Sequence, residues 1–98
     1  MSEAYAVVLL IQIEVLVPHA RSLKDKRAAV KGLKDRLRNR FNASVAEVGY
    51  LDKWQRGLLG VALVGSDRRH LESEAGRLQQ VCEEAPDLQL IATTRDWL

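Results

Sequence analysis

The sequence predicts an α+β fold whose elements follow the order β-α-β-β-α-β, and three observations support this prediction. Four segments rich in Val, Leu and Ile have strand-like spacing, and two charged segments carry apolar residues at helical spacing. Turn-forming residues separate the six segments. The chain has 98 residues, of which 47% are hydrophobic and 29% charged, as expected for a single soluble domain over residues 1–98.

The first segment, YAVVLLIQIEVLV at residues 5–17, is expected to form a long central strand. Every second residue from Val7 to Val17 is apolar, so one face of this strand should be fully buried. Pro18 ends the strand.

The first helix is expected from about Leu23 to Arg40. Ser22 is a suitable N-cap, and Asp25 stands in the capping-box position three residues later. Gly32 lies inside the helix, opposite the apolar arc, and should cost about 1 kcal/mol relative to Ala. The residues expected to face the core are Leu23, Val30, Leu33, Leu37 and Phe41.

After a turn at Asn42, residues 44–50 alternate as a second strand, and the polar residues 51–57 form a loop. Residues 58–65, LLGVALVG, are apolar on both faces, which predicts a second central strand.

A second helix is expected over residues 68–85, capped by Ser66 or Asp67, with Cys82 on its core stripe. Residues 88–93 form the last strand, and Trp97 should fix the C-terminus to the sheet. Two right-handed β-α-β units joined by a hairpin give a ferredoxin-like sandwich. Its four-stranded antiparallel sheet carries both helices on one face, and the first and third strands are central.

Charge is distributed very unevenly along this chain. Residues 21–40 hold nine of the 15 basic residues and two of the 13 acidic ones, a local charge of +7, whereas the remainder sums to −5. At 100° per residue, five of these cations fall within an arc of about 80° beside the apolar arc. We call this set the cationic stripe: Lys24, Arg27, Lys31, Lys34 and Arg38.

The stripe predicts an anionic partner, of which phosphate is the usual one. The alternative is an ordinary solvated helix face. Arg21, near the helix start, and Arg56, in the predicted loop, are added as candidate nucleic-acid contacts. Arg36 and Arg40 lie off the stripe.

Four segments carry a resemblance to a known family: SLKDKR at residues 22–27, LKDRLRNRFNASVAEV at 33–48, WQRGLLGVALVGSD at 54–67 and DWL at 96–98. Together they resemble the YlxP-like family of small bacterial proteins, whose function is unknown. The resemblance spans nearly the whole chain and implies a ferredoxin-like fold. It also implies a gene often found among those for translation-initiation and ribosome-maturation factors, and so a ribosome- or RNA-associated role. The chain departs from the family at Gly57 and Gly65, where Ala and Ser are more frequent.

Nothing in the sequence indicates an enzyme, a cofactor or a metal site. Acylphosphatases share the predicted fold but need a Gly-rich phosphate loop, and the loop here, PHARS at residues 18–22, has no glycine. His19, His70 and Cys82 match no metal-ligand spacing. His19, Arg21 and Lys24 could hold one phosphate at the helix start, although a capped helix with a solvated histidine explains the same residues.

The expected function is therefore that of a non-catalytic accessory protein that docks on structured RNA, most simply ribosomal RNA. An RNA-recognition motif would stack bases on aromatic residues of its central strands, and the third strand here has none. The contact is thus expected between the first helix and the phosphate backbone.

The sheet face away from the helices is a second candidate surface, because Val8, Leu10 and Leu16 should point outward there. A homodimer or a protein partner would cover it, which gives the alternative of a protein-interaction module. A small-ligand regulatory domain is the third alternative. Trp54 could stack on a base or anchor a partner, but we expect its ring to fold back over the hairpin and cover the core edge.

The sequence also predicts that the protein is cytoplasmic and does not associate with a membrane. The apolar run at residues 4–17 is too short to span a bilayer, and the start MSEAYA lacks the basic region of a secretory signal. A single cysteine excludes an internal disulfide, which suits a reducing compartment.

Overall fold

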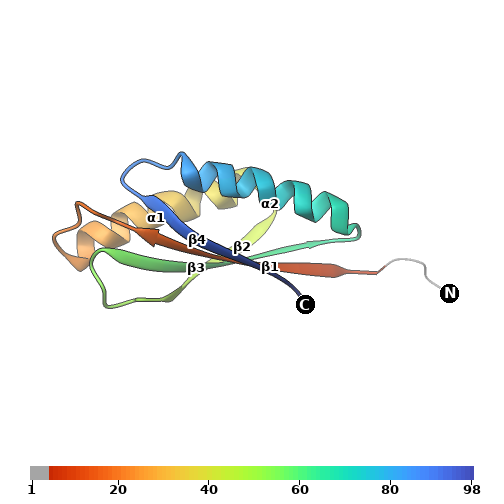
Figure 1. Cartoon of the computed structure of the whole chain (residues 1–98), viewed down its shortest axis with the longest axis horizontal. Coiled ribbons are helices and arrows are strands. Elements are labelled where there is room, and N and C mark those ends of the chain that lie inside the picture. The colour runs from red at the N-terminus through yellow and green to blue at the C-terminus, as the bar shows by residue number, and fades with distance from the viewer. Residues whose placement is uncertain (1–4) are drawn as a thin grey trace.

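The computed structural model describes residues 5–98, so the first four residues, which include most of the MSEAYA start, lie outside the described part. The elements occur in the predicted order and form a four-stranded antiparallel sheet with both helices on one face (Figure 1). Their bounds are β1 Val7–Leu16, α1 Leu23–Arg40, β2 Ala43–Gly49, β3 Arg56–Gly65, α2 Arg68–Glu83 and β4 Gln89–Trp97. The predicted ferredoxin-like sandwich is confirmed.

The strand order is β2-β3-β1-β4, which confirms that β1 and β3 are central. The core forms between the sheet and the helices, because alternate residues of β1 and β3 face the apolar stripes of α1 and α2. Leu9 pairs with Leu63, Ile11 with Val61 and Ile13 with Leu59, and all six side chains are buried.

The start of α1 has the predicted cap with one change. The Asp25 backbone N–H donates to Ser22 Oγ at 3.0 Å, which confirms Ser22 as the N-cap. The Asp25 carboxylate accepts from the backbone N–H of Arg21, also at 3.0 Å, rather than from that of Ser22. At the other end of the helix, Phe41 is buried in the core as predicted.

The predicted strand boundaries differ from the observed ones by one or two residues in β1 and β2, and two further differences concern β3 and β4. β3 begins at Arg56, because Arg56 and Gly57 pair with Leu16 and Val15 of β1, although their sequence resembles a polar loop. β4 continues to Trp97, four residues beyond the predicted end. Its last residues are polar because β4 is an edge strand with one exposed face, yet they keep their register with β1 as far as Trp97 opposite Leu9.

The C-terminus is held as predicted. Trp97 packs against the core, and the Leu98 backbone N–H donates to the Val8 carbonyl at 2.9 Å. The second helix ends at Glu83, two residues earlier than expected, and Asp67 rather than Ser66 caps its start. Neither helix within residues 5–98 has the length and apolar character needed to cross a membrane.

Candidate nucleic-acid interface

The cationic stripe lies on α1 as predicted, and its members differ in what they contact. Lys24 and Arg27 are exposed, Lys34 is half-buried, and none of these three has an ion-pair partner within residues 5–98. Their charge is therefore available to a ligand. They stand at i, i+3 and i+10, spanning about 15 Å along the helix at 1.5 Å per residue.

The other two members of the stripe have contacts within the protein. Lys31 Nζ forms an ion pair with Asp35 Oδ2 at 2.8 Å, one helical turn away. This contact lowers the pKa of the Asp35 carboxyl below its ordinary value. Arg38 donates from Nη2 to the backbone carbonyl of Val45 in β2 at 2.7 Å. These contacts reduce the charge that the stripe offers but leave Lys31 three-quarters exposed.

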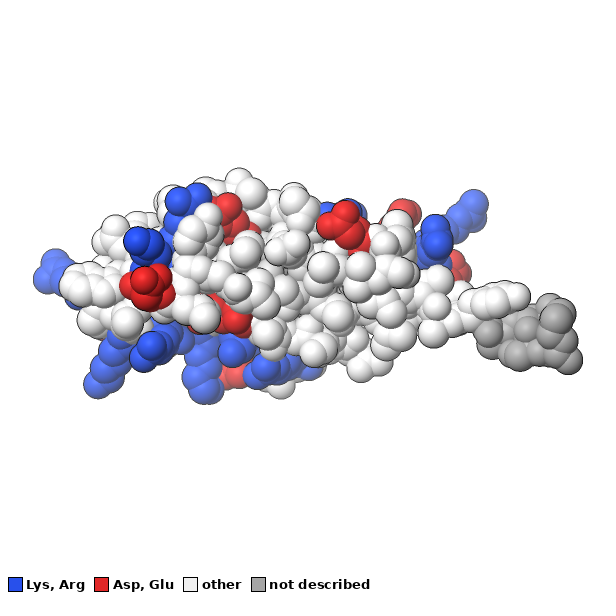
Figure 2. Space-filling model, turned by 90° about the horizontal axis from the view of Figure 1, so that it is seen from below, with Lys and Arg blue, Asp and Glu red and all other residues white. Residues whose placement is uncertain are grey.

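The Arg38 contact also locates the stripe in the fold. Because Arg38 reaches Val45, the stripe runs on the side of α1 that faces the edge strand β2. Figure 2 views the sheet from the side opposite the helices and shows Lys and Arg side chains gathered along one long edge of that face. The largest group of positive side chains on the face seen in Figure 2 thus lies along this edge.

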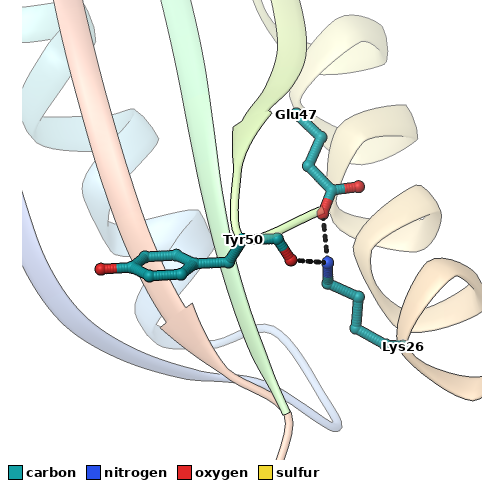
Figure 3. Close-up of polar contacts among 3 residues, drawn as sticks. All are labelled: Lys26, Glu47 and Tyr50. Atoms are coloured by element: carbon teal, nitrogen blue, oxygen red, sulfur yellow. Dashed lines mark hydrogen bonds and ion pairs between the residues drawn. The ribbon is translucent and has the colours of Figure 1, made fainter. Parts of the chain in front are cut away.

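Lys26 of α1 has a buried structural role that was not predicted. Its side chain is fully buried, and Nζ contacts the Glu47 carboxylate and donates to the Tyr50 carbonyl oxygen at 2.8 Å (Figure 3). A charge removed from water needs such partners, and each further hydrogen bond offsets part of the desolvation cost. Lys26 is therefore a structural cation and not part of the exposed stripe.

A signal for this residue was present in the sequence. At 100° per residue, Lys26 lies 60° before Leu23, in the middle of the arc occupied by Val30, Leu33 and Leu37. A lysine within an apolar arc predicts either a buried ion pair or a side chain that reaches outward to water. Glu47 of β2 pairs with buried Leu59 and so lies on the side of the sheet that faces the helices. It is therefore the acidic residue with which Lys26 could form an ion pair.

The start of α1 is a poor phosphate site. Asp25 places its carboxylate at the backbone N–H of Arg21, so a negative charge already occupies this end of the helix. His19 is exposed and lines a shallow hollow that also contains Asp25 and Asp87. The arrangement supports the capped helix with a solvated histidine.

A pocket of about 480 Å³ lies at the β2–β3 hairpin, beside the end of β1. Trp54, whose ring was expected to cover the core edge, is 54% exposed and does not pack on the core. That expectation is wrong: about half of the Trp54 surface is exposed, and its side chain lines a pocket with Leu16 and Tyr50 instead of packing on the core. The lining residues are Leu16, Tyr50, Lys53, Trp54, Gln55 and Arg56. The hairpin-end pocket, as we call it, unites Leu16 and Trp54 from the predicted partner-binding set.

Arg56 forms one wall of the hairpin-end pocket. Its Nε donates to Glu14 Oε2 at 2.6 Å, and its guanidinium carbon lies 4.5 Å from the centre of the Tyr50 ring. The contact with Glu14 raises the pKa of Arg56 above its ordinary value. The Glu14 carboxylate neutralises much of the Arg56 charge, so Arg56 should attract a phosphate less strongly than the unpaired cations of the stripe do.

Val8 and Leu10 lie apart from this pocket, on the open face of the sheet. They pair with Val64 and Ala62 of β3, and Val64 is 55% exposed. The central part of this face in Figure 2 carries few charged side chains. The predicted partner-binding residues therefore belong to two surfaces, the hairpin-end pocket and the open face.

The described residues, 5–98, contain no group of three or more His, Cys, Asp and Glu side chains placed to hold a metal ion. Cys82 is buried on the core side of α2, as predicted, and burial raises the pKa of its thiol to about 12. A thiol with this pKa is a packing group with little nucleophilic character at neutral pH.

Comparison with known proteins assigns this chain to a family. A family model described as "Protein of unknown function (DUF503)" matches residues 8–95. The "Uncharacterized protein YlxP" of Bacillus subtilis (strain 168) is 37% identical over 86 residues, which cover 88% of this chain and 94% of the relative. Among solved structures, the "De novo designed protein Foldit4" superposes with a TM-score of 0.55 at 12% identity, covering 96% of this chain and 97% of that one. This last likeness concerns the fold alone.

Proposed function

The chain belongs to the DUF503 family of proteins of unknown function, and we propose that it is a non-catalytic accessory protein that docks on structured RNA through α1. The observation that carries the proposal is the row of Lys24, Arg27 and Lys34. These cations share one side of a helix and have no ion-pair partner within residues 5–98. A row of positive charge on a rigid helix fits the regular phosphates of a paired RNA strand.

The internal contacts of the stripe support docking on the backbone rather than base readout. Arg38 is fixed on Val45, and no aromatic side chain accompanies the stripe on α1. Base readout on the sheet would need aromatic residues on the central strands, whereas the outward positions of β3 are occupied by residues such as Gly60 and Ala62. The proposed contact therefore follows the position of phosphates and the shape of the RNA.

Cosedimentation with purified ribosomal subunits across a salt series tests this function. If each of the three free cations neutralises one phosphate of a paired strand, the logarithm of affinity falls with the logarithm of salt at a slope of about −3. The slope approaches about −4.5 if Lys31 and Arg38 also contact the RNA. Binding that is insensitive to salt, or absent at low salt, would contradict the proposal.

The open sheet face supports a second candidate function, the formation of a homodimer. Val48 and Val64 are 52% and 55% exposed, and Val64 lies on the same face as its partner Val8. Ala62, opposite Leu10, also lies on this face. Sedimentation velocity of the wild type and of a Val64→Glu variant tests this function: the wild type should form a dimer and the variant a monomer. A monomeric wild type at high concentration excludes it.

A further inference from the structure

The hairpin-end pocket has one wall that the fold holds in place. Lys26 donates to the Tyr50 carbonyl at 2.8 Å, while the Tyr50 ring points to the other side of the strand (Figure 3). Tyr50 has a φ of 54°, the left-handed region that a tyrosine rarely adopts, so the buried lysine stabilises an unusual conformation. Arg56, held by Glu14, then lies over the ring at 4.5 Å. This wall is assembled before any ligand arrives.

The opposite side of the pocket offers unused contacts. Trp54 is 54% exposed, and its indole has no hydrogen-bond partner within residues 5–98. Lys53 lines the same pocket and makes no ion pair with any described residue. The lining residues include no acid, and the Glu14 carboxylate beside Arg56 is paired with that arginine. The pocket is therefore apolar and aromatic inside, with positive charge at its rim.

The pocket lies at the same end of the molecule as the start of the cationic stripe. The backbone N–H of Val17 donates to the Gln55 carbonyl at 2.9 Å, and Gln55 Nε2 donates to the carbonyls of Pro18 and Ala20 at 3.2 and 3.1 Å. These contacts join the hairpin turn to the loop that leads into Arg21 and Lys24. The pocket and the start of the stripe are therefore joined through the 17–20 loop at one end of the molecule.

We propose that the hairpin-end pocket receives one unpaired nucleobase of the RNA whose phosphates contact α1. This inference rests on the proposed function and names the RNA feature that the protein prefers, a duplex with a bulged nucleotide. The base stacks on Trp54, and Lys53 neutralises a neighbouring phosphate. A nucleotide matches the pocket because it combines a flat aromatic ring with a negative charge, and stacking on an aromatic side chain tolerates any base. The volume of about 480 Å³ lies in the range of small-ligand pockets, roughly 300–1,000 Å³.

The test uses two RNA duplexes of about 16 base pairs, one fully paired and one with a single bulged adenosine. The protein carries Trp97→Phe so that emission comes from Trp54 alone. The bulged duplex should bind at least about fivefold more tightly and quench Trp54, since stacking of one base on an aromatic residue contributes at least this much. Trp54→Leu should remove the preference and leave the affinity for the paired duplex unchanged. Trp54→Phe, which keeps a ring, should retain most of the preference.

The outcomes separate this inference from the function on which it rests. Equal affinity for both duplexes without quenching would overturn the pocket inference and leave docking through α1 intact. Failure to bind either duplex at low salt would overturn both. Adenosine monophosphate serves as a third probe: if it quenches Trp54 at the same concentration as the bulged duplex, the pocket recognises free nucleotides and the inference is wrong.

Discussion

The Lys26 amine donates to the Tyr50 carbonyl oxygen at 2.8 Å, and this contact joins the helix that carries the cationic stripe to the wall of the hairpin-end pocket. The same amine contacts Glu47 of β2, so one buried charge links α1 both to β2 and to Tyr50, the first residue after it. The stripe and the pocket are therefore held at fixed positions relative to each other.

Replacement of Lys26 by Met tests how much this contact stabilises the fold. The variant leaves the Glu47 carboxylate, 16% exposed, and the Tyr50 carbonyl without their partner. We expect the free energy of unfolding in urea to fall by about 3 kcal/mol, the range found when one partner of a buried ion pair is removed. The double variant Lys26→Met/Glu47→Gln should cost less than the sum of the two single variants. Additive costs would show that the two side chains do not interact.

Asp35 limits the charge of the stripe, because its carboxylate is paired with Lys31 at 2.8 Å. An Asp35→Asn variant releases Lys31 and should bind ribosomal subunits more tightly, with a salt slope steeper by up to about one. Stability should change by less than about 0.5 kcal/mol, because exposed i,i+4 pairs contribute little. Anisotropy titrations across a salt series measure the slope. Unchanged affinity would show that the RNA does not approach this side of α1.

Gly32 is exposed in the middle of α1, and a Cβ added there would meet no atom within 4 Å. A Gly32→Ala substitution should therefore raise the free energy of unfolding by about 1 kcal/mol, through the higher helix propensity of alanine alone. Gly76 of α2 is equally open and provides the matched variant, Gly76→Ala, away from the stripe. Chemical denaturation measures both changes, and a loss of stability in either variant would contradict the helix geometry described.

The stability of the protein should decline in alkaline solution because of Cys82. Burial raises the pKa of this thiol from its ordinary value of 9.0 to about 12, so above pH 9 the unfolded chain loses a proton that the folded protein keeps. The unfolded state then binds fewer protons, and the contribution of the thiol to stability is lost as the pH rises from about 9 to 12. Between pH 8 and 10, the wild type should lose about 1 kcal/mol more than a Cys82→Ala variant. Equal losses would show that the thiol titrates normally.

The sequence was sufficient to predict the fold, for physical reasons that particular residues illustrate. The alternation from Val7 to Val17 and the two-sided apolar segment at 58–65 identify the central strands, since only central strands are buried to that extent. The end of β4 was missed because an edge strand needs few apolar residues. Arg56 was assigned to a loop because its strand position depends on pairing with Leu16, a long-range contact that local sequence does not encode.

The candidate site was predicted less completely. The position of the stripe follows from helical periodicity alone, whereas the contacts of Arg38 with Val45 and of Arg56 with Glu14 depend on how the helix and strands pack. The hairpin-end pocket collects residues from β1, the turn and β3, and the exposure of Trp54 within it depends on the path of that turn. The role of Lys26 could have been inferred from its position in the apolar arc.

The most direct test of the account compares two triple variants with equal net charge in cosedimentation with ribosomal subunits. One variant, Lys24→Gln/Arg27→Gln/Lys34→Gln, removes the free cations of the stripe. The other, Arg68→Gln/Arg69→Gln/Arg77→Gln, removes three cations from α2, and circular dichroism confirms that both variants fold. We predict that the wild type and the α2 variant cosediment at low salt and are released as salt rises, while the α1 variant remains in the supernatant. Equal binding by the two variants would contradict the claim that α1 is the surface that docks on RNA.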